Sequence, residues 1–408
     1  MNCTIQNLAG FTVVLLIVTS CVNANDEVKT ALLKHFPQAD TDKDGAISDA
    51  EETAVRQQIL KRFSQADRDG DGTLSDTEMK AVLRQAAKRR KGNTPNSGNS
   101  RTSKSSKKPD PQSQLVALGL KSELNIEYKK NTAQQRNKLD FIYPKKKWHE
   151  RAPLFIYIHG GGNTGGTKGA IYSKGNLIIK ELTDAGIAVA TIDYRVFGQG
   201  EELGFHQLFQ DCKNALRFLA KNSDRFGIDP HKMVTWGTSA GGSKALICAL
   251  TSHDFLAGEV TGPGTEHTVL GAISFFGATT YLVPELWKKR LERFPSRSQS
   301  KGEMMFKPTD GMSTEEIRNL VSADQYLKST SPPILLVHGD TDPTVPIELS
   351  KHLDQQAKAK NADVKLVEVK NAGHGFSLVR GSKAAPSMTW DETQKLVISQ
   401  TLEWVNQK

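Results

Sequence analysis

A serine in a glycine-rich turn is the first residue whose setting indicates chemistry. Ser239 lies in the run GTSAGG at 237–242, directly after the apolar stretch Met233–Trp236. A G-x-S-x-G turn between a strand and a helix exposes a serine hydroxyl as a nucleophile. In so tight a turn, bulky side chains at Gly237 and Gly241 should clash. The pattern predicts that Ser239 is presented at the N-terminus of a helix.

A second glycine cluster, HGGG at 159–162, follows the apolar stretch Leu154–His159. The backbone N–H groups of Gly161 and Gly162, with that of Ala240, would stabilise the negative oxygen that forms during acyl transfer. A flexible loop and a phosphate cradle are the alternatives. No G-K-[ST] follows in P-loop spacing, which argues against nucleotide binding. We interpret His159 as a structural residue rather than a base.

A general base and an acid that orients it must come from later in the chain. His374 lies in NAGHGF at 371–376, and Asp342 lies in HGDTDPTVP at 338–346. In a serine mechanism His374 would accept the proton of Ser239 and later activate water, while Asp342 would hold the imidazole in the required tautomer. Asp340 is the rival for the acid.

Short apolar stretches alternate with longer amphipathic ones from about residue 114 onward. The expected strands are Leu124–Tyr128, Leu139–Tyr143, Leu154–His159, Ile187–Tyr194, Met233–Trp236, Val269–Phe276, Ile334–His338 and Val364–Val369. The expected helices are near 174–185, 206–222, 240–251, 347–360 and 391–406. Alternation of this kind predicts a mostly parallel sheet between two layers of helices. The candidate residues all follow strands, so they should meet at one edge of that sheet.

These motifs together carry a resemblance to a known family. Residues 114–408 resemble the α/β-hydrolase family, in particular its carboxylesterase branch with an HGGG loop, and within it the bacterial esterases related to feruloyl and acetylxylan esterases. The matching motifs are HGGG at 159–162, IDYR at 192–195, FGIDP at 226–230, GTSAGG at 237–242, HGDTDPTVP at 338–346 and AGHGF at 372–376.

The resemblance implies an α/β-hydrolase fold with an eight-stranded sheet. It also implies a serine esterase that needs no catalytic cofactor, with Asp342 as the acid. Asn163 departs from the aromatic residue that many relatives carry after HGGG, which leaves the acyl preference open.

Residues 277–330 form a long insertion between two expected strands. Its apolar members are Tyr281, Leu286, Trp287, Phe294, Met304, Met305 and Phe306. Long excursions of a compact domain are often functional. We expect this insertion to cap the active site; simple packing beside the sheet is the alternative.

Two acidic twelve-residue loops occur near the N-terminus. Oxygen ligands fall at the spacing that Ca²⁺ requires: in the first loop they come from Asp40, Asp42, Asp44, Ala46 and Glu51, and in the second from Asp67, Asp69, Asp71, Thr73 and Glu78. Gly45 and Gly72 occupy the sixth position of each loop. Both loops resemble EF-hands. Residues 25–87 are therefore expected to be a small all-α pair that binds structural calcium, with only 52–66 to serve as the intervening helices.

The remaining segments concern targeting. Residues 1–24 resemble a secretory signal, because the apolar run Phe11–Val18 is short and Val22-Asn23-Ala24 supplies small residues for cleavage. We expect an exported protein, secreted or periplasmic, with no transmembrane helix. Alternatively, this segment resembles a bacterial lipobox, in which case Cys21 would carry a lipid anchor. Of the remaining cysteines, Cys212 and Cys248 are expected to be buried thiols, and a disulfide between them is left open.

The basic excess is concentrated in one polar stretch. The chain has a net charge of +9, and residues 88–113 contain eight Lys or Arg against one Asp. This stretch is rich in Ser, Asn and Pro, so it is expected to be a solvated linker rather than a nucleic-acid site. A polybasic tether to an anionic surface is the alternative.

Three functional hypotheses follow. The first is a secreted serine esterase that cleaves short acyl esters, with acylated polysaccharide as a plausible substrate. The second is a peptidase of the prolyl-oligopeptidase type, which shares the fold but usually carries a large β-propeller or an equivalent N-terminal domain. The third is a calcium-dependent binding protein with a non-catalytic hydrolase domain.

Overall fold

The computed structural model divides the chain into two compact units, Met1–Lys104 and Ser105–Lys408. It describes residues 28–30, 32–33, 39–62, 67, 71–79, 82–83, 110–130, 133–147, 150–379 and 384–407. The predicted signal segment 1–24 with Cys21, residues 88–109 of the predicted linker, and the predicted ligand Asp69 lie outside the described residues.

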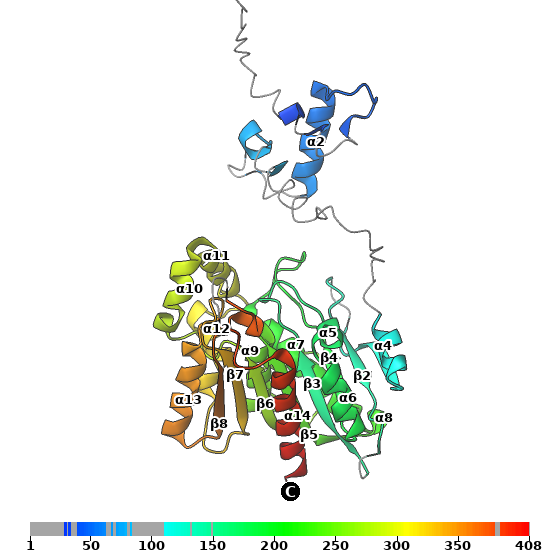
Figure 1. The fold of residues 1–408 in the computed structure, drawn as a ribbon, viewed down its shortest axis with the longest axis vertical. Helices are drawn as coiled ribbons and strands as arrows, with labels where there is room; N and C mark the ends of the chain where they lie inside the picture. Colours follow the sequence, from blue (N-terminus) through cyan, green and yellow to red (C-terminus); the bar gives the residue numbers. More distant parts are fainter. Residues whose placement is uncertain are drawn as a thin grey trace, which may run out of the picture. The chain divides into compact units, whose positions relative to one another are not determined.

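The larger unit is built on one eight-stranded sheet (Figure 1). Its strands are β1 (Ser122–Glu127), β2 (Lys138–Ile142), β3 (Ala152–Ile158), β4 (Ala188–Ile192), β5 (Ile228–Thr238), β6 (Val269–Phe275), β7 (Ile334–Gly339) and β8 (Val364–Val369). Their order is β1-β2-β4-β3-β5-β6-β7-β8. The strand β2 is antiparallel to β1 and β4, and all other pairs are parallel. The predicted mostly parallel sheet is confirmed.

Helices cover both faces of the sheet. They are α4 (Pro111–Ala117), α5 (Ile171–Lys174), α6 (Asn176–Asp184), α7 (Phe205–Lys221), α8 (Ser223–Phe226), α9 (Ala240–Leu250), α10 (Lys288–Arg293), α11 (Pro295–Met305), α12 (Thr314–Leu320), α13 (Glu348–Lys360) and α14 (Trp390–Asn406). Figure 1 shows α6 and α14 together on one face. Helices α7, α9 and α13 contribute residues to a hydrophobic cluster on the other face.

A short helix overlaps the end of the predicted linker. The helix α4 begins at Pro111, and the Asp110 side chain caps it by accepting the N–H groups of Gln112 and Ser113. An aspartate at the N-cap followed by proline is a strong start signal for a helix. The first three residues of α4 therefore fall within the segment 88–113 that was predicted to be a linker.

The near-continuous apolar strands are explained by two hydrophobic clusters, one on each face. Along β3, Leu154 and Ile156 belong to one cluster, whereas Phe155 and Tyr157 belong to the other. All seven residues of this strand are buried. Successive side chains point to opposite faces, so a strand covered on both sides must be apolar throughout. This rigid centre holds the loops that follow β5, β7 and β8.

The smaller unit contains helix α2 (Asp49–Arg62). Its hydrophobic cluster joins residues before, within and after the two acidic loops: Val28, Leu32, Ala39, Ile47, Leu74, Met79 and Leu83. Ile47 and Leu74 occupy the same position in their respective loops, and both are buried. The two loops therefore share one small core, even though only residues 52–66 separate them.

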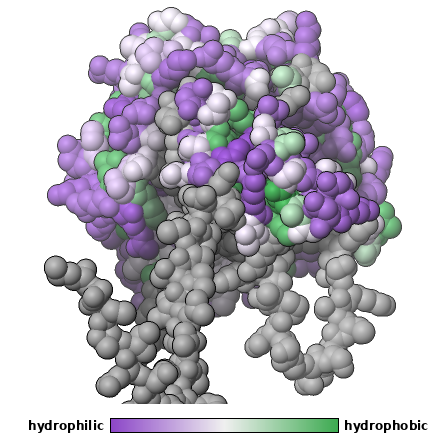
Figure 2. Space-filling view, turned by 90° about the horizontal axis from the view of Figure 1, so that it is seen from above, coloured by the Kyte–Doolittle hydropathy of each residue, from purple (hydrophilic) through white to green (hydrophobic). Residues whose placement is uncertain are grey.

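The face shown in Figure 2 is mostly hydrophilic where it is coloured, with scattered apolar patches. The large, exposed hydrophobic side chains of the described residues are Val116, Leu291 and Leu378. Within the described part of the chain, we find no helix with the length and apolar character needed to cross a bilayer.

Candidate active site

The turn between β5 and α9 holds Ser239 in a constrained backbone conformation. Its φ is 54° and its ψ is −120°, a combination that non-glycine residues rarely adopt. A Cβ at Gly237 would lie 2.1 Å from the Gly241 carbonyl oxygen, and one at Gly241 would lie 2.1 Å from the Ile158 carbonyl oxygen. The predicted need for glycine at both positions is confirmed, and the close packing fixes Ser239 at the start of α9.

The structure brings Ser239, His374 and Asp342 together from three different loops. His374 Nε2 lies 3.0 Å from Ser239 Oγ. His374 Nδ1 lies 2.7 Å from Asp342 Oδ2. The three residues follow β5, β8 and β7, whose carboxyl ends share one edge of the sheet. Asp342, and not its rival Asp340, makes the hydrogen bond with His374.

The Asp342 carboxylate is buried and well supplied with donors. Its Oδ1 accepts the backbone N–H groups of Thr344 at 2.7 Å and Val345 at 3.1 Å. Its Oδ2 also lies 3.4 Å from His338 Nε2. Burial by itself would raise the pKa of Asp342, but the hydrogen bonds of His338 and His374 outweigh burial and hold the pKa well below its usual value. The carboxylate is thus ionised at neutral pH.

His338 is a supporting residue. Its side chain is fully buried, with Nδ1 2.7 Å from Ser350 Oγ and Nε2 2.9 Å from the Val345 carbonyl oxygen. It braces the loop that carries Asp342. In the sequence, the only indication of this role was the position of His338 at the start of the HGDTDPTVP motif that contains Asp342.

The HGGG loop adopts conformations that require glycine. Gly161 has a φ of +122°, and a Cβ there would lie 2.1 Å from the Gly165 carbonyl oxygen. Gly162 and Ala240 line the same pocket as Ser239, whereas Gly161 is not among its lining residues. Two of the three predicted oxyanion donors therefore belong to residues that line the same cavity as Ser239.

His159, the first residue of that loop, is buried and stacks on Tyr194 with ring centroids 4.2 Å apart. Its Nδ1 lies 2.7 Å from the Gly160 carbonyl oxygen. Burial lowers the pKa of His159 to about 3, so the ring is neutral at physiological pH. Its place in the core agrees with a structural role.

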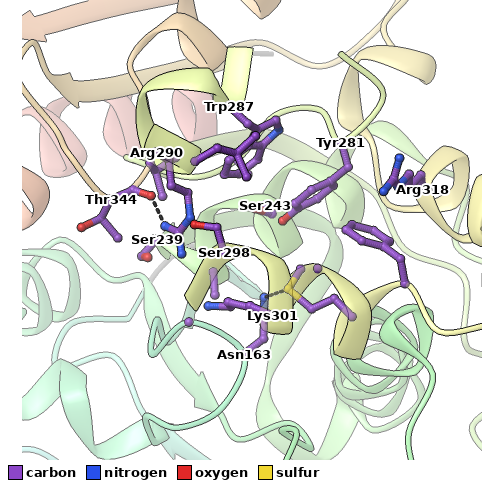
Figure 3. Close-up of a pocket in the computed structure, with 18 of the residues that line it drawn as sticks. Asn163, Ser239, Ser243, Tyr281, Trp287, Arg290, Ser298, Lys301, Arg318 and Thr344 are labelled. Carbon is purple, nitrogen blue, oxygen red and sulfur yellow. Dashed lines mark hydrogen bonds between the residues drawn. The ribbon is translucent and has the colours of Figure 1, made fainter. Parts of the chain in front are cut away.

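The insertion between β6 and β7 covers Ser239, as expected. A cavity of about 230 Å³ contains Ser239, and most of its walls come from the insertion (Figure 3). The contributing residues of the insertion are Ala278, Tyr281, Pro284, Trp287, Arg290, Leu291, Ser298, Lys301, Gly302, Met305, Phe306 and Arg318. The prediction that the insertion covers this site is confirmed, because its side chains line the cavity around Ser239 in addition to packing beside the sheet.

Sequence reasoning missed Lys244, a fully buried lysine on α9. Its Nζ donates to Asn163 Oδ1 at 2.7 Å and to the Ala240 carbonyl oxygen at 3.3 Å, and lies 4.7 Å from the Tyr194 ring centroid and 4.5 Å from that of Phe209. Burial lowers the pKa of Lys244 to about 7. Lys244 thus anchors the residue that replaces the usual aromatic side chain after HGGG. A lysine within an otherwise small and apolar helix was the signal.

The first acidic loop gathers hard oxygen ligands. One carboxylate oxygen from each of Asp40, Asp42 and Asp44 lies within 4.8 Å of the others. Glu51 accepts the backbone N–H of Ser48 at 3.0 Å. This donor set suits Ca²⁺, which prefers carboxylate and carbonyl oxygens.

The second loop repeats the pattern where it is described. Asp67 accepts the Gly72 N–H at 3.0 Å, and Gly72 has a φ of +82°. Glu78 accepts the Ser75 N–H at 2.9 Å, matching the bond between Glu51 and Ser48 in the first loop. Equivalent hydrogen bonds in both loops indicate the same local fold. Asp69 lies outside the described residues.

The sheet order, the serine turn and the loops after β7 and β8 define an α/β-hydrolase fold. The sequence matches the BD-FAE family over residues 139–357, and it matches the EF-hand family over residues 33–51 and 60–83. The first match spans more than half of the chain, and the protein belongs to the BD-FAE family. The predicted resemblances, to esterases of the α/β-hydrolase fold and to EF-hands, are confirmed.

Similar proteins include Esterase LipC of Mycobacterium tuberculosis, 26% identical over 240 residues that make up 58% of this chain and 56% of the relative. Isoprenylcysteine alpha-carbonyl methylesterase ICME of Arabidopsis thaliana is 29% identical over 239 residues, 57% of this chain and 52% of the relative. The chain spans about half the length of the curated relatives it matches.

Two solved structures share the fold. A truncated carbohydrate esterase from gut microbiota has a TM-score of 0.54 at 20% identity, covering 70% of this chain and 97% of that one. Esterase 2 of Thermogutta terrifontis has a TM-score of 0.52 at 20% identity, covering 71% of this chain and 97% of that one. At this identity the likeness establishes the fold alone.

Proposed function

We propose that the chain is a serine carboxylic ester hydrolase. The observation that carries the proposal is the continuous hydrogen-bonded line from Ser239 through His374 to Asp342, with distances of 3.0 and 2.7 Å. A nucleophile, a base and an orienting acid within hydrogen-bond reach form the arrangement used for acyl transfer. Membership of a family with esterase relatives favours ester over peptide bonds.

The mechanism uses this geometry directly. His374 Nε2 removes the Ser239 proton as Oγ attacks the ester carbonyl carbon. His374 then gives this proton to the alcohol oxygen as the ester C–O bond breaks, which leaves an acyl-enzyme. In the second half His374 removes a proton from water as it attacks the acyl carbon; the bond from that carbon to Ser239 Oγ then breaks, His374 returns the proton to Oγ, and the carboxylic acid is released. The ionised Asp342 stabilises the imidazolium that forms in each half. The backbone N–H groups near Gly162 and Ala240 are the proposed donors to the developing oxyanion.

The direct test is the substitution Ser239→Ala in the full mature chain. Removing the attacking atom should lower acetyl-ester turnover by about 10⁴-fold or more. Ser399→Ala, at an exposed position on α14, is the matched control and should retain full turnover. Circular dichroism would establish that both variants are folded. If Ser239→Ala keeps more than a few per cent of the activity, Ser239 is not the nucleophile.

The substrates are proposed to be short acyl esters, with acylated polysaccharides as natural targets. The cavity of about 230 Å³ suits a small acyl group together with part of a larger alcohol. A panel of acetyl and longer nitrophenyl esters, acetylated xylan, feruloylated sugars and long-chain lipids tests this. Hydrolysis confined to long-chain lipids would contradict it.

Two further proposals concern the N-terminal region. The EF-hand loops would bind Ca²⁺ through Asp40, Asp42, Asp44 and their counterparts in the second loop, stabilising the small unit without entering the ester chemistry. Residues 1–24 would direct export, as the short apolar run Phe11–Val18 indicates. Isothermal titration with Ca²⁺ tests the first of these. The N-terminal sequence of the protein recovered from the medium or periplasm tests the second, and a lipid on Cys21 would favour anchoring.

A further inference from the structure

Three cationic side chains line the proposed catalytic pocket. Arg290 comes from α10, Lys301 from α11 and Arg318 from α12, so each helix of the cap contributes one. All the lining residues belong to the continuously described stretch 150–379, and none of them is an aspartate or glutamate. The lining thus contains three positively charged side chains and no negatively charged one.

Two of these cations lie beside the proposed catalytic groups. Arg290 donates a hydrogen bond to the carbonyl oxygen of Thr344, in the loop that carries Asp342. Lys301 Nζ lies next to the HGGG loop, since a Cβ built on Gly162 would be 2.8 Å from it. Figure 3 shows both side chains in the part of the pocket nearest Ser239.

The third cation has an unsatisfied donor. The Arg318 guanidinium lies 4.8 Å from the Phe306 ring centroid. Its Nε is buried and has no hydrogen-bond partner among the described residues. A buried donor of a charged group without an acceptor is costly, and native structures usually supply one. Because Arg318 lines the pocket and is only partly buried, an anionic ligand there would pair with its guanidinium group and offset this cost.

We propose that this pocket selects esters carrying an anionic group, a carboxylate or a sulfate, in addition to the ester itself. The inference rests on the proposed esterase function and narrows its substrate class. The apolar wall of Trp287, Met305 and Phe306 would contact the ring or chain of the substrate, while Lys301, Arg290 and Arg318 would pair with its charge. Acidic or sulfated sugar esters and half-esters of dicarboxylic acids have this chemistry.

The test compares kcat/KM for charged esters and neutral analogues of similar shape, using the full mature chain. On the acyl side, mono-4-nitrophenyl adipate, whose carboxylate is too distant for efficient attack on its own ester, is paired with 4-nitrophenyl heptanoate. On the alcohol side, 4-acetoxybenzoate is paired with 4-acetoxybenzamide, and 4-acetoxybenzenesulfonate with its sulfonamide. Each value is divided by the rate constant for hydroxide hydrolysis of the same ester, which removes differences in intrinsic reactivity.

We expect the corrected ratio of charged to neutral ester to reach about tenfold in at least one pair, as for one charge-assisted interaction in a partly enclosed site. The pair that shows it assigns the charge to the acyl or the alcohol side, and to carboxylate or sulfonate. Because salt screens charges, the ratio should fall at 0.5 M sodium chloride.

Variants connect the preference to the named side chains. Lys301→Gln and Arg318→Gln should each lower the ratio by about threefold to tenfold, and Arg318→Lys should lower it less than Arg318→Gln. Lys288→Gln removes an exposed cap lysine that does not line the pocket, so the ratio should stay at the wild-type value. Melting temperatures would establish that the variants are folded.

The outcomes separate the two proposals. Hydrolysis of neutral esters that depends on Ser239, with corrected ratios near one in every pair, would overturn the anionic preference and leave the esterase in place. An equal fall in the ratio for Lys288→Gln would also overturn it, because a general surface charge would then be responsible. Failure to hydrolyse any ester in the panel would overturn the esterase and the preference together.

Discussion

Replacing the buried Lys244 with methionine should change how the stability of the catalytic unit depends on pH. Lys244 is fully buried, and burial lowers its pKa from 10.5 to about 7. Between these two values the unfolded chain binds the proton and the folded chain does not. Stability therefore rises with pH across this window, and below about pH 7 the folded protein bears the full cost of burying the charge.

The magnitude follows from that shift. Lowering the pKa of Lys244 from 10.5 to about 7 raises the free energy of unfolding by about 4 kcal/mol between pH 7 and pH 10.5. The rings of Tyr194 and Phe209, at 4.7 and 4.5 Å, favour the charged form and reduce the gain by up to about 2 kcal/mol. The hydrogen bond to Asn163 is lost in the variant at every pH, so it shifts the whole curve without changing its slope. We expect a net change of about 2–4 kcal/mol.

The assay is urea unfolding of wild type and Lys244→Met at pH 7, 8, 9 and 10, followed by tryptophan fluorescence. All five tryptophans lie in the larger unit, so the EF-hand unit does not contribute to the signal. Subtracting one protein from the other cancels the groups that they share, such as Lys213. The free energy of unfolding of wild type should rise relative to the variant as pH increases. A flat difference, or one that falls with pH, would refute a buried lysine of lowered pKa.

Other predictions address the acid, the glycine turn and calcium. Asp342→Asn should lower turnover by about 10³–10⁴-fold, and Asp340→Asn, matched in chemistry, by far less; the opposite ranking would exchange their roles. Gly241→Ala forces a Cβ to within 2.1 Å of the Ile158 carbonyl oxygen, so unfolding should become easier by about 3 kcal/mol. Gly302→Ala is the control: a Cβ there would meet nothing within 4 Å, and alanine is favoured in a helix, so the free energy of unfolding should not fall. If the Gly241→Ala and Gly302→Ala variants are equally stable, the predicted clash at Gly241 is refuted. A chelator should make the EF-hand unit more sensitive to protease and change acetyl-ester turnover by less than about twofold; complete loss of turnover would show a regulatory role.

The expected strands and helices agreed with the structure because their signals are local. Strands such as β3 are apolar throughout because both of their faces are buried. The turn around Ser239 could be read from Gly237 and Gly241, since the clash that excludes other residues arises within a few residues and the adjoining strand. The order along the chain of the three residues that meet, Ser239, Asp342 and His374, was equally visible. The seven-residue helix capped by Asp110 was not among the expected helices, because so short a helix has little amphipathic pattern.

Only the tertiary structure decided which distant groups meet. Asp340 and Asp342 are two residues apart on one loop, and the way that loop turns after β7 determines which of them meets His374. The bond from Lys244 to Asn163 joins residues 81 positions apart, and no local pattern predicts it. The short helices of the cap have weak periodicity, so their sequence did not reveal that Lys301 lies near Gly162. Such contacts depend on how loops and helices pack on the finished sheet, which alternation of apolar and polar residues does not specify.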